Sequence, residues 1–221
     1  MNGFLTILAK ELRVEARSRE MLSGGLLLIL LVLVLSNLAW SDVSSGRALA
    51  AGVLWIALTF AGTSSLSRNL HRERDRGTWE GLALLPVDWG TIYLAKALAN
   101  LLVLLVLAAF LLPLYALFFN VGLLHALPRL ALVLLLGLAG FAAAGTLIAT
   151  ASGHAQAREV LLPVLLFPLL VPLLMMAIQA TQRVLDGVPL GGVMQEIQLL
   201  AAFDIIFLAI GWLTYDYLLG E

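Results

Sequence analysis

The feature that most constrains this chain is a series of long apolar runs between charged residues. Glu20 and Asp42 flank the first run, at residues 22–40, and Arg47 and Arg68 flank the second, at residues 48–66. A helix needs roughly 20 apolar residues to cross a hydrocarbon core about 30 Å thick. Such runs are therefore predicted to be transmembrane helices, whose backbone polar groups are all satisfied within the helix.

Four further apolar runs follow, at residues 92–119, 129–151, 160–181 and 199–219. Residues 120–128 combine asparagine, glycine and proline, so we predict a turn there. The chain is 62% hydrophobic and 12% charged, whereas an average soluble domain is roughly 45–50% apolar and about 25% charged. We predict an all-α polytopic membrane protein with six transmembrane helices, in which residues 1–221 form one transmembrane domain.

The positions of lysine and arginine predict the orientation, because cytoplasmic loops carry the excess of these residues. With the N-terminus inside, only Arg47, Arg129 and Arg183 fall on the outer side. Six spans then return the C-terminus to the cytoplasm. The net charge of −1 provides no basic field that would attract nucleic acid.

Residues 2–20 form a separate element ahead of the first span. On a helical wheel Phe4, Leu8 and Leu12 share one arc, and the basic residues share the opposite arc. This pattern predicts an amphipathic helix that lies in the membrane interface. A solvated leader with ordinary flanking positive charge is the alternative, and Glu15, inside the apolar arc, counts against the interfacial helix.

The one long cytoplasmic loop, residues 67–90, has an ordered layout. A charged stretch ends at Gly77 and Thr78, after which Trp79 and three leucines give a short apolar face that stops at Pro86. Glycine permits a turn, threonine caps the next helix, and Glu80 lies near the positive end of that helix's dipole. The result is a short amphipathic helix that docks in another protein's groove, or a positive loop that lies on lipid headgroups.

The stretch from Glu73 to Pro86, with Lys96 at the head of the next helix, resembles the loop of ABC-2-type permeases. In that superfamily the loop between spans two and three touches the ATPase subunit. The resemblance therefore implies a cytoplasmic coupling helix and an interface with the ATPase made by Glu73, Arg74, Asp75, Gly77, Thr78, Trp79, Glu80, Leu82, Leu84, Leu85 and Pro86.

The likeness extends along the chain. Residues 4–13, 134–145 and 161–174 are similar to the heme exporter protein B family of cytochrome c maturation permeases. This implies a multi-pass protein of the bacterial inner membrane without its own ATPase site, and no Walker A sequence is present. It also implies an ABC ATP-binding subunit that binds ATP, other cytochrome c maturation membrane proteins as partners, and heme as cargo rather than as a tightly bound cofactor.

The same resemblance implies a homodimer or a pair with another permease-like subunit, since ABC machines need two permease halves. Two alternatives stay open from the sequence. One is an ABC-2-type permease for a lipid, a drug or a polysaccharide. The other is a structural membrane partner that transports nothing.

A few residues within or beside the spans are candidate functional residues. Asp204 is predicted about one turn inside the outer end of the last helix, where it is either a functional intramembrane acid or an ordinary carboxylate at the membrane interface. His125 is a candidate heme contact on the outer side, whereas His71 and His154 lie in inner loops, and no two histidines have metal-ligand spacing. Three prolines, Pro163, Pro168 and Pro172, predict that the fifth span is kinked or locally unwound.

Ser152 and His154 also suggest an intramembrane serine hydrolase, which is a different class of protein. Residues so close in sequence do not place a hydroxyl and an imidazole on separate elements as a nucleophile and its base. The sequence therefore favours the permease.

Overall fold

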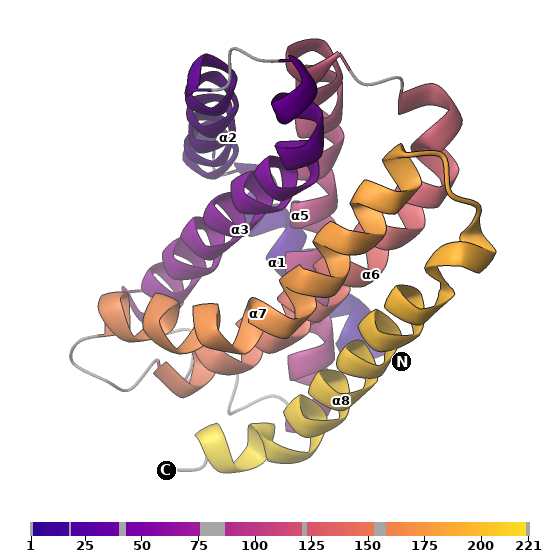
Figure 1. Ribbon diagram of the computed structural model, residues 1–221. Coiled ribbons are helices and arrows are strands. Elements are labelled where there is room, and N and C mark those ends of the chain that lie inside the picture. Colours follow the sequence, from indigo (N-terminus) through magenta and orange to yellow (C-terminus); the bar gives the residue numbers. More distant parts are fainter. Residues whose placement is uncertain are drawn as a thin grey trace.

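The computed structural model describes residues 2–17, 19–39, 43–75, 87–120, 123–152 and 158–219. Helices are the only regular secondary structure of these residues, so the prediction of an all-helical chain is confirmed for them (Figure 1). The helices are α1 (Asn2–Arg17), α2 (Arg19–Ala39), α3 (Val43–Asp75), α5 (Trp89–Phe119), α6 (Leu123–Ser152), α7 (Arg158–Leu185), a short 3-10 helix η1 (Leu190–Val193) and α8 (Met194–Leu219).

Five of the described helices are long and apolar enough to cross a membrane. These candidate spans are Leu49–Asn69, Trp89–Phe119, His125–Ser152, Leu161–Leu185 and Leu190–Leu218. The apolar part of α2, Gly24–Ala39, is shorter. Length and composition therefore show a multi-pass membrane protein, and a sixth span formed by α2 stays a prediction.

Several helices extend beyond the predicted apolar runs. The loop predicted over residues 67–90 is shorter, because α3 continues to Asp75 and α5 already begins at Trp89. The predicted turn at residues 120–128 is shorter too, since α6 begins at Leu123 and includes Pro128. The predicted apolar segments end at the first charged residue, whereas a helix outside the hydrocarbon core tolerates charged residues and ends only at a residue that breaks it.

The two ends of α5 have clear capping residues. Asp88 precedes the helix and its Oδ2 accepts a hydrogen bond from the Thr91 backbone N–H at 2.9 Å. Hydrogen bonds from Thr91 hold the pKa of the Asp88 carboxyl below its usual value. Asn120 ends the helix with φ of 49°, in the left-handed region that asparagine tolerates. A polar residue next to each end of the apolar run therefore sets the helix bounds.

The helix α7 runs without interruption through Pro163, Pro168 and Pro172. Local unwinding of this span, one of the two predicted outcomes, is therefore wrong. Each proline removes one backbone donor, and packing against neighbouring helices keeps such a segment helical. The helices α6 and α8 both pack on α7.

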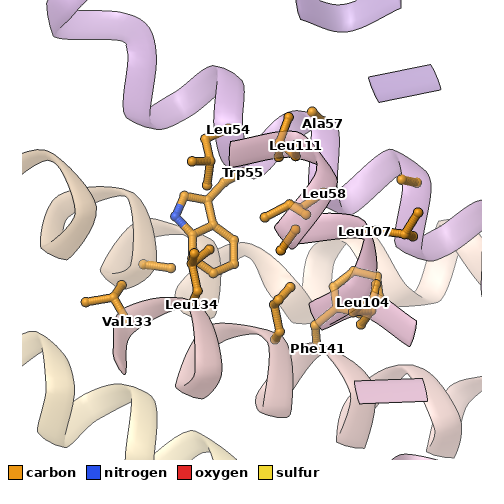
Figure 2. Packing of buried hydrophobic residues seen from close by; sticks show 14 of the residues in the cluster. Leu54, Trp55, Ala57, Leu58, Leu104, Leu107, Leu111, Val133, Leu134 and Phe141 are labelled. Carbon is orange, nitrogen blue, oxygen red and sulfur yellow. The ribbon is translucent and has the colours of Figure 1, made fainter. Parts of the chain in front are cut away.

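The main core lies where α3, α5, α6 and α7 meet, around the buried indole of Trp55. Figure 2 shows this side chain pointing from α3 toward Leu134 of α6. The Trp55 Nε1 donates to Thr181 Oγ1 of α7 at 2.9 Å, and both residues are buried. On α6 the ring occupies the space that a Cβ at Gly137 would fill. Gly137 of α6 and the Thr181 hydroxyl of α7 thus allow α3, α6 and α7 to pack around Trp55.

Large apolar side chains also cover much of the outer surface of the described helices. They include Leu27, Leu31 and Leu38 of α2, Phe110 and Leu117 of α5, Val171 and Met175 of α7, and Ile205, Ile206, Leu213 and Tyr217 of α8. Soluble monomers rarely expose contiguous apolar patches of this extent. The surface is that of a bundle surrounded by lipid.

Candidate functional site

The apolar face of α1 packs on the beginning of α5. A second core cluster includes Ile7 of α1, which is 4% exposed, together with Ile92 and Tyr93 of α5. Phe4 and Val87 pack against the same cluster. The amphipathic helix predicted over residues 2–20 corresponds to α1, which ends at Arg17, and its apolar face docks on the bundle.

A small polar cavity of about 40 Å³ lies beside this contact. It is found where α3 ends, α5 begins and α6 ends, and we refer to this part of the molecule as the α1 end. The cavity is lined by Glu11, Leu12, Glu15, Leu66, Asn69, Lys96, Ala99, Asn100, Val103, Thr146, Ala149 and Thr150. A polar space of this size holds about two or three water molecules.

Charged groups from different helices share this cavity. Lys96 of α5 is 7% exposed and Glu15 of α1 is 8% exposed. Glu11 also faces the cavity and accepts a hydrogen bond from Lys10 Nζ at 2.9 Å. Buried charges are costly unless opposite charges or hydrogen bonds compensate them. The cavity therefore places an ammonium group and two carboxylates in one protein-lined site.

Hydrogen bonds continue from the cavity between the helices. Asn69 of α3 donates to Asn100 Oδ1 at 3.3 Å, and Asn100 Nδ2 donates to Thr146 Oγ1 of α6 at 2.8 Å. One turn further along α6, Thr150 Oγ1 donates to the Tyr215 hydroxyl of α8 at 3.2 Å. Three interhelical side-chain hydrogen bonds thus link α3, α5, α6 and α8 near the α1 end.

Two glycines allow α5 and α8 to approach closely in the same region. A Cβ at Gly211 would overlap the Tyr93 ring, and a Cβ at Gly90 would overlap the Trp212 indole. The Tyr93 hydroxyl lies 3.1 Å from the Ala143 carbonyl and 3.0 Å from the Phe207 carbonyl. Small residues that permit close backbone contact are typical of helix packing in membranes.

Asp204 lies deeper in the bundle than the sequence predicted. Because α8 begins at Met194, this residue is ten positions into the helix, or about 15 Å. The prediction of one turn is wrong because Gln195, Glu196 and Gln198, which end the apolar run, are part of the helix. Asp204 is 6% exposed, and its Oδ1 has no hydrogen-bond partner in the described part of the chain. A Cβ at Gly140 of α6 would lie 2.6 Å from this oxygen.

The opposite end of the bundle is held by two arginines. Arg129 Nη1 donates to the Val188 carbonyl at 2.8 Å, and Arg183 Nη1 donates to Glu196 Oε1 at 2.7 Å. His125 is exposed in the first turn of α6, and its carbonyl accepts a hydrogen bond from Arg129 Nη2. These contacts fasten the connection between α7 and α8 to the start of α6.

The other sequence-predicted residues are distributed as follows. Glu73, Arg74 and Asp75 are the last residues of α3. Gly77, Thr78, Trp79, Glu80, Leu82, Leu84, Leu85, Pro86 and His154 lie outside the described residues. The Ser152 hydroxyl donates to the Ile148 carbonyl at 2.7 Å, which is the usual hydrogen bond of a helical serine to the carbonyl one turn before it.

Sequence reasoning missed the polar cavity, although two signals point to it. Lys96 is the eighth residue of α5, and Glu15 interrupts the apolar arc of α1. Each residue alone is a single irregularity in its own helix. Only the packing of α1 on α5 brings them to one site.

Two comparisons with known proteins point to the same family over most of the chain. The family described as CcmB protein matches residues 2–215. A curated relative, heme exporter protein B of Pseudomonas aeruginosa, is 30% identical over 192 residues, which cover 86% of this chain and 86% of the relative. The chain therefore belongs to the CcmB family.

Proposed function

We propose that this chain is the permease subunit of an ABC transporter that exports heme for c-type cytochrome assembly in a bacterial inner membrane. The observation that carries the proposal is the match to a heme exporter over 86% of both chains. The proposed cargo is heme, and a separate subunit binds and hydrolyses ATP. The chain works as a homodimer or beside another permease-like subunit, with other cytochrome c maturation proteins as partners.

In this proposal the α1 end faces the cytoplasm and α2 completes a set of six spans. Lys10 and Arg13 of α1, Arg68 of α3 and Lys96 of α5 lie toward the α1 end, whereas Arg129 and Arg183 lie toward the other. This asymmetry supports the orientation, because cytoplasmic segments carry the excess of positive residues. His125 then lies on the outer side, where we propose that it contacts departing heme.

The coupling mechanism uses the segment between α3 and α5. We propose that the interface residues from Glu73 to Pro86 dock on the ATPase, and that closure of the ATPase on ATP tilts α3 and α5. The two helices are directly joined to this segment and pack on each other. A displacement at the segment therefore reaches the bundle through two rigid elements.

Charge inversion in the coupling segment tests this mechanism. We expect Glu80→Lys to abolish ATP hydrolysis that depends on the permease, because it places a positive charge at the positive end of the coupling helix. Gly77→Pro is expected to do the same by removing the turn. The measurement is the copurification of the ATPase subunit and its activity, together with the level of assembled cytochrome c.

Asp186→Lys is the matched control, since Asp186 is exposed at the opposite end of the bundle. Retained assembly and coupled activity in both Glu80→Lys and Gly77→Pro would refute the coupling mechanism. A chain that purifies alone, or normal cytochrome c assembly in its absence, would refute the proposed function.

We also propose that Asp204 is a functional acid at the contact of α6 and α8. A buried carboxyl oxygen without a partner is costly in lipid, so its retention at the Gly140 contact points to a role other than packing. Asp204→Asn keeps the shape and removes the ionisable group. We expect the variant to accumulate normally and to lose cytochrome c assembly; normal assembly would contradict the role.

A further inference from the structure

The surface of α1 that faces the bundle carries charge as well as apolar side chains. Glu11 and Glu15 are one turn apart, and both line the cavity that Lys96 enters from α5. A helix that lies in the membrane interface without packing on the bundle would keep its carboxylates in water. Instead, Glu15 is as deeply buried as Lys96.

Resting on the proposed function, we propose that Lys96 and the two carboxylates of α1 form a buried charge cluster that fixes α1 to α5. The cluster makes α1 and the first turns of α5 a single unit that moves with the coupling segment. Lys96 is a positioning residue in this unit: it holds α1 in place and does not contact the cargo.

Two further observations support a unit built from α1 and α5. Val87 directly follows the coupling segment and packs against the cluster that contains Ile7 of α1 and Ile92 of α5. The chain therefore leaves the segment at a residue that already contacts α1. Lys96 and Asn100 are one turn apart on α5, and Asn100 hydrogen-bonds to both α3 and α6. A shift of this unit is thus passed to two other helices.

A cysteine pair tests whether the charges hold α1. The chain has no cysteine of its own, so an introduced pair reacts without background. A Cβ built on Gly3 lies 3.7 Å from the Val87 Cβ, which matches the mean Cβ separation of about 3.8 Å in disulfides. The closer contact, 2.6 Å to Val87 Cγ2, disappears when Val87 becomes cysteine. We expect Gly3→Cys/Val87→Cys to cross-link under mild oxidation.

Charge removal in this background gives the decisive comparison. We expect Lys96→Met to lower the yield of the disulfide about tenfold, because the buried carboxylates lose their opposite charge. The chain has two lysines, and Lys10→Met is the matched control, since the Lys10 side chain is 36% exposed and is not among the residues that line the cavity. Lys96→Arg is expected to retain the cross-link.

Glu15→Gln gives the same test if Lys96→Met does not fold, because it removes one charge and preserves the shape. Its disulfide yield is expected to fall as well. Equal yields in the parent, Glu15→Gln and Lys10→Met proteins would overturn the charge cluster. Folding is checked in each case from the elution profile in detergent, independently of the cross-link.

ATP hydrolysis by the complex with the ATPase subunit tests whether α1 and the first turns of α5 move together, which we call the common motion. If α1 and α5 move as one unit, the oxidised Gly3→Cys/Val87→Cys complex hydrolyses ATP as fast as the reduced complex. Loss of hydrolysis on oxidation, with recovery on reduction, would show that α1 separates from α5 and would overturn the common motion. If no ATPase copurifies, the proposed function and the common motion both fail, whereas the disulfide yields still decide the charge cluster.

Discussion

Trp55→Ala is expected to lower the free energy of unfolding by about 3 kcal/mol. Truncation of a buried tryptophan costs about 3–5 kcal/mol in soluble proteins, as the sum of a transfer term and a cavity term. When the helices of a membrane protein separate, the Trp55 side chain moves from protein into lipid and not into water. The transfer term is therefore small and the cavity term dominates. Thr181 also loses its hydrogen-bond donor. The effect is therefore expected at the lower end of the range.

The measurement is unfolding of the purified protein by SDS titration in mixed micelles. Ile56→Ala is the matched control, since Ile56 is the next residue of α3 and is 47% exposed toward the lipid. Thr181→Val removes only the hydrogen bond, which is worth about 0.6 kcal/mol in membrane proteins. A similar loss in Trp55→Ala and Ile56→Ala would show that α3 does not pack through this face.

Gly211→Ala is expected to destabilise the protein by about 1–3 kcal/mol, the usual cost of overpacking. The added Cβ overlaps the Tyr93 ring. That ring is held in place, because its hydroxyl shares its proton between the Ala143 and Phe207 carbonyls, which both lie within hydrogen-bond distance. Gly211→Leu, which adds a longer side chain, is expected to prevent accumulation of folded protein.

Gly52→Ala is the control for Gly211→Ala, because among the described residues no atom beyond the local backbone of α3 lies within 4 Å of a Cβ at Gly52. Alanine is the better helix former, so this change is expected to be neutral or stabilising. Tyr93→Ala combined with Gly211→Ala is expected to cost less than the sum of the two single changes. Both comparisons use the same SDS titration, and an additive double variant would refute the proposed contact.

The two buried charges near the α1 end illustrate the limits of helical periodicity. Glu15 interrupts the apolar arc of α1, and in the sequence it counts against an amphipathic helix. In the structure the same position faces the cavity shared with Lys96. The position of Glu15 in α1 is explained by Lys96 of α5. The periodicity of residues within α1 contains no information about a residue in another helix.

The sequence by itself determined the class of fold and most of the helices. Charges between apolar runs identify the candidate spans, and capping residues such as Asp88 and Asn120 set the bounds of α5. The motifs were also sufficient to predict the family, which the match over residues 2–215 confirms. These properties depend on residues that are near each other in the chain.

Only the tertiary structure decided which face of each helix is buried, that Asp204 is among the buried residues, and which glycines contact other helices. The apolar character of the spans is similar on the sides that face protein and lipid: in α8, Leu200 is fully buried whereas Leu213 is 69% exposed. In water, burial separates apolar from polar positions and leaves a periodic pattern in the sequence. In lipid both sides are apolar, so the faces are selected by close packing and by hydrogen bonds between residues that are distant in sequence.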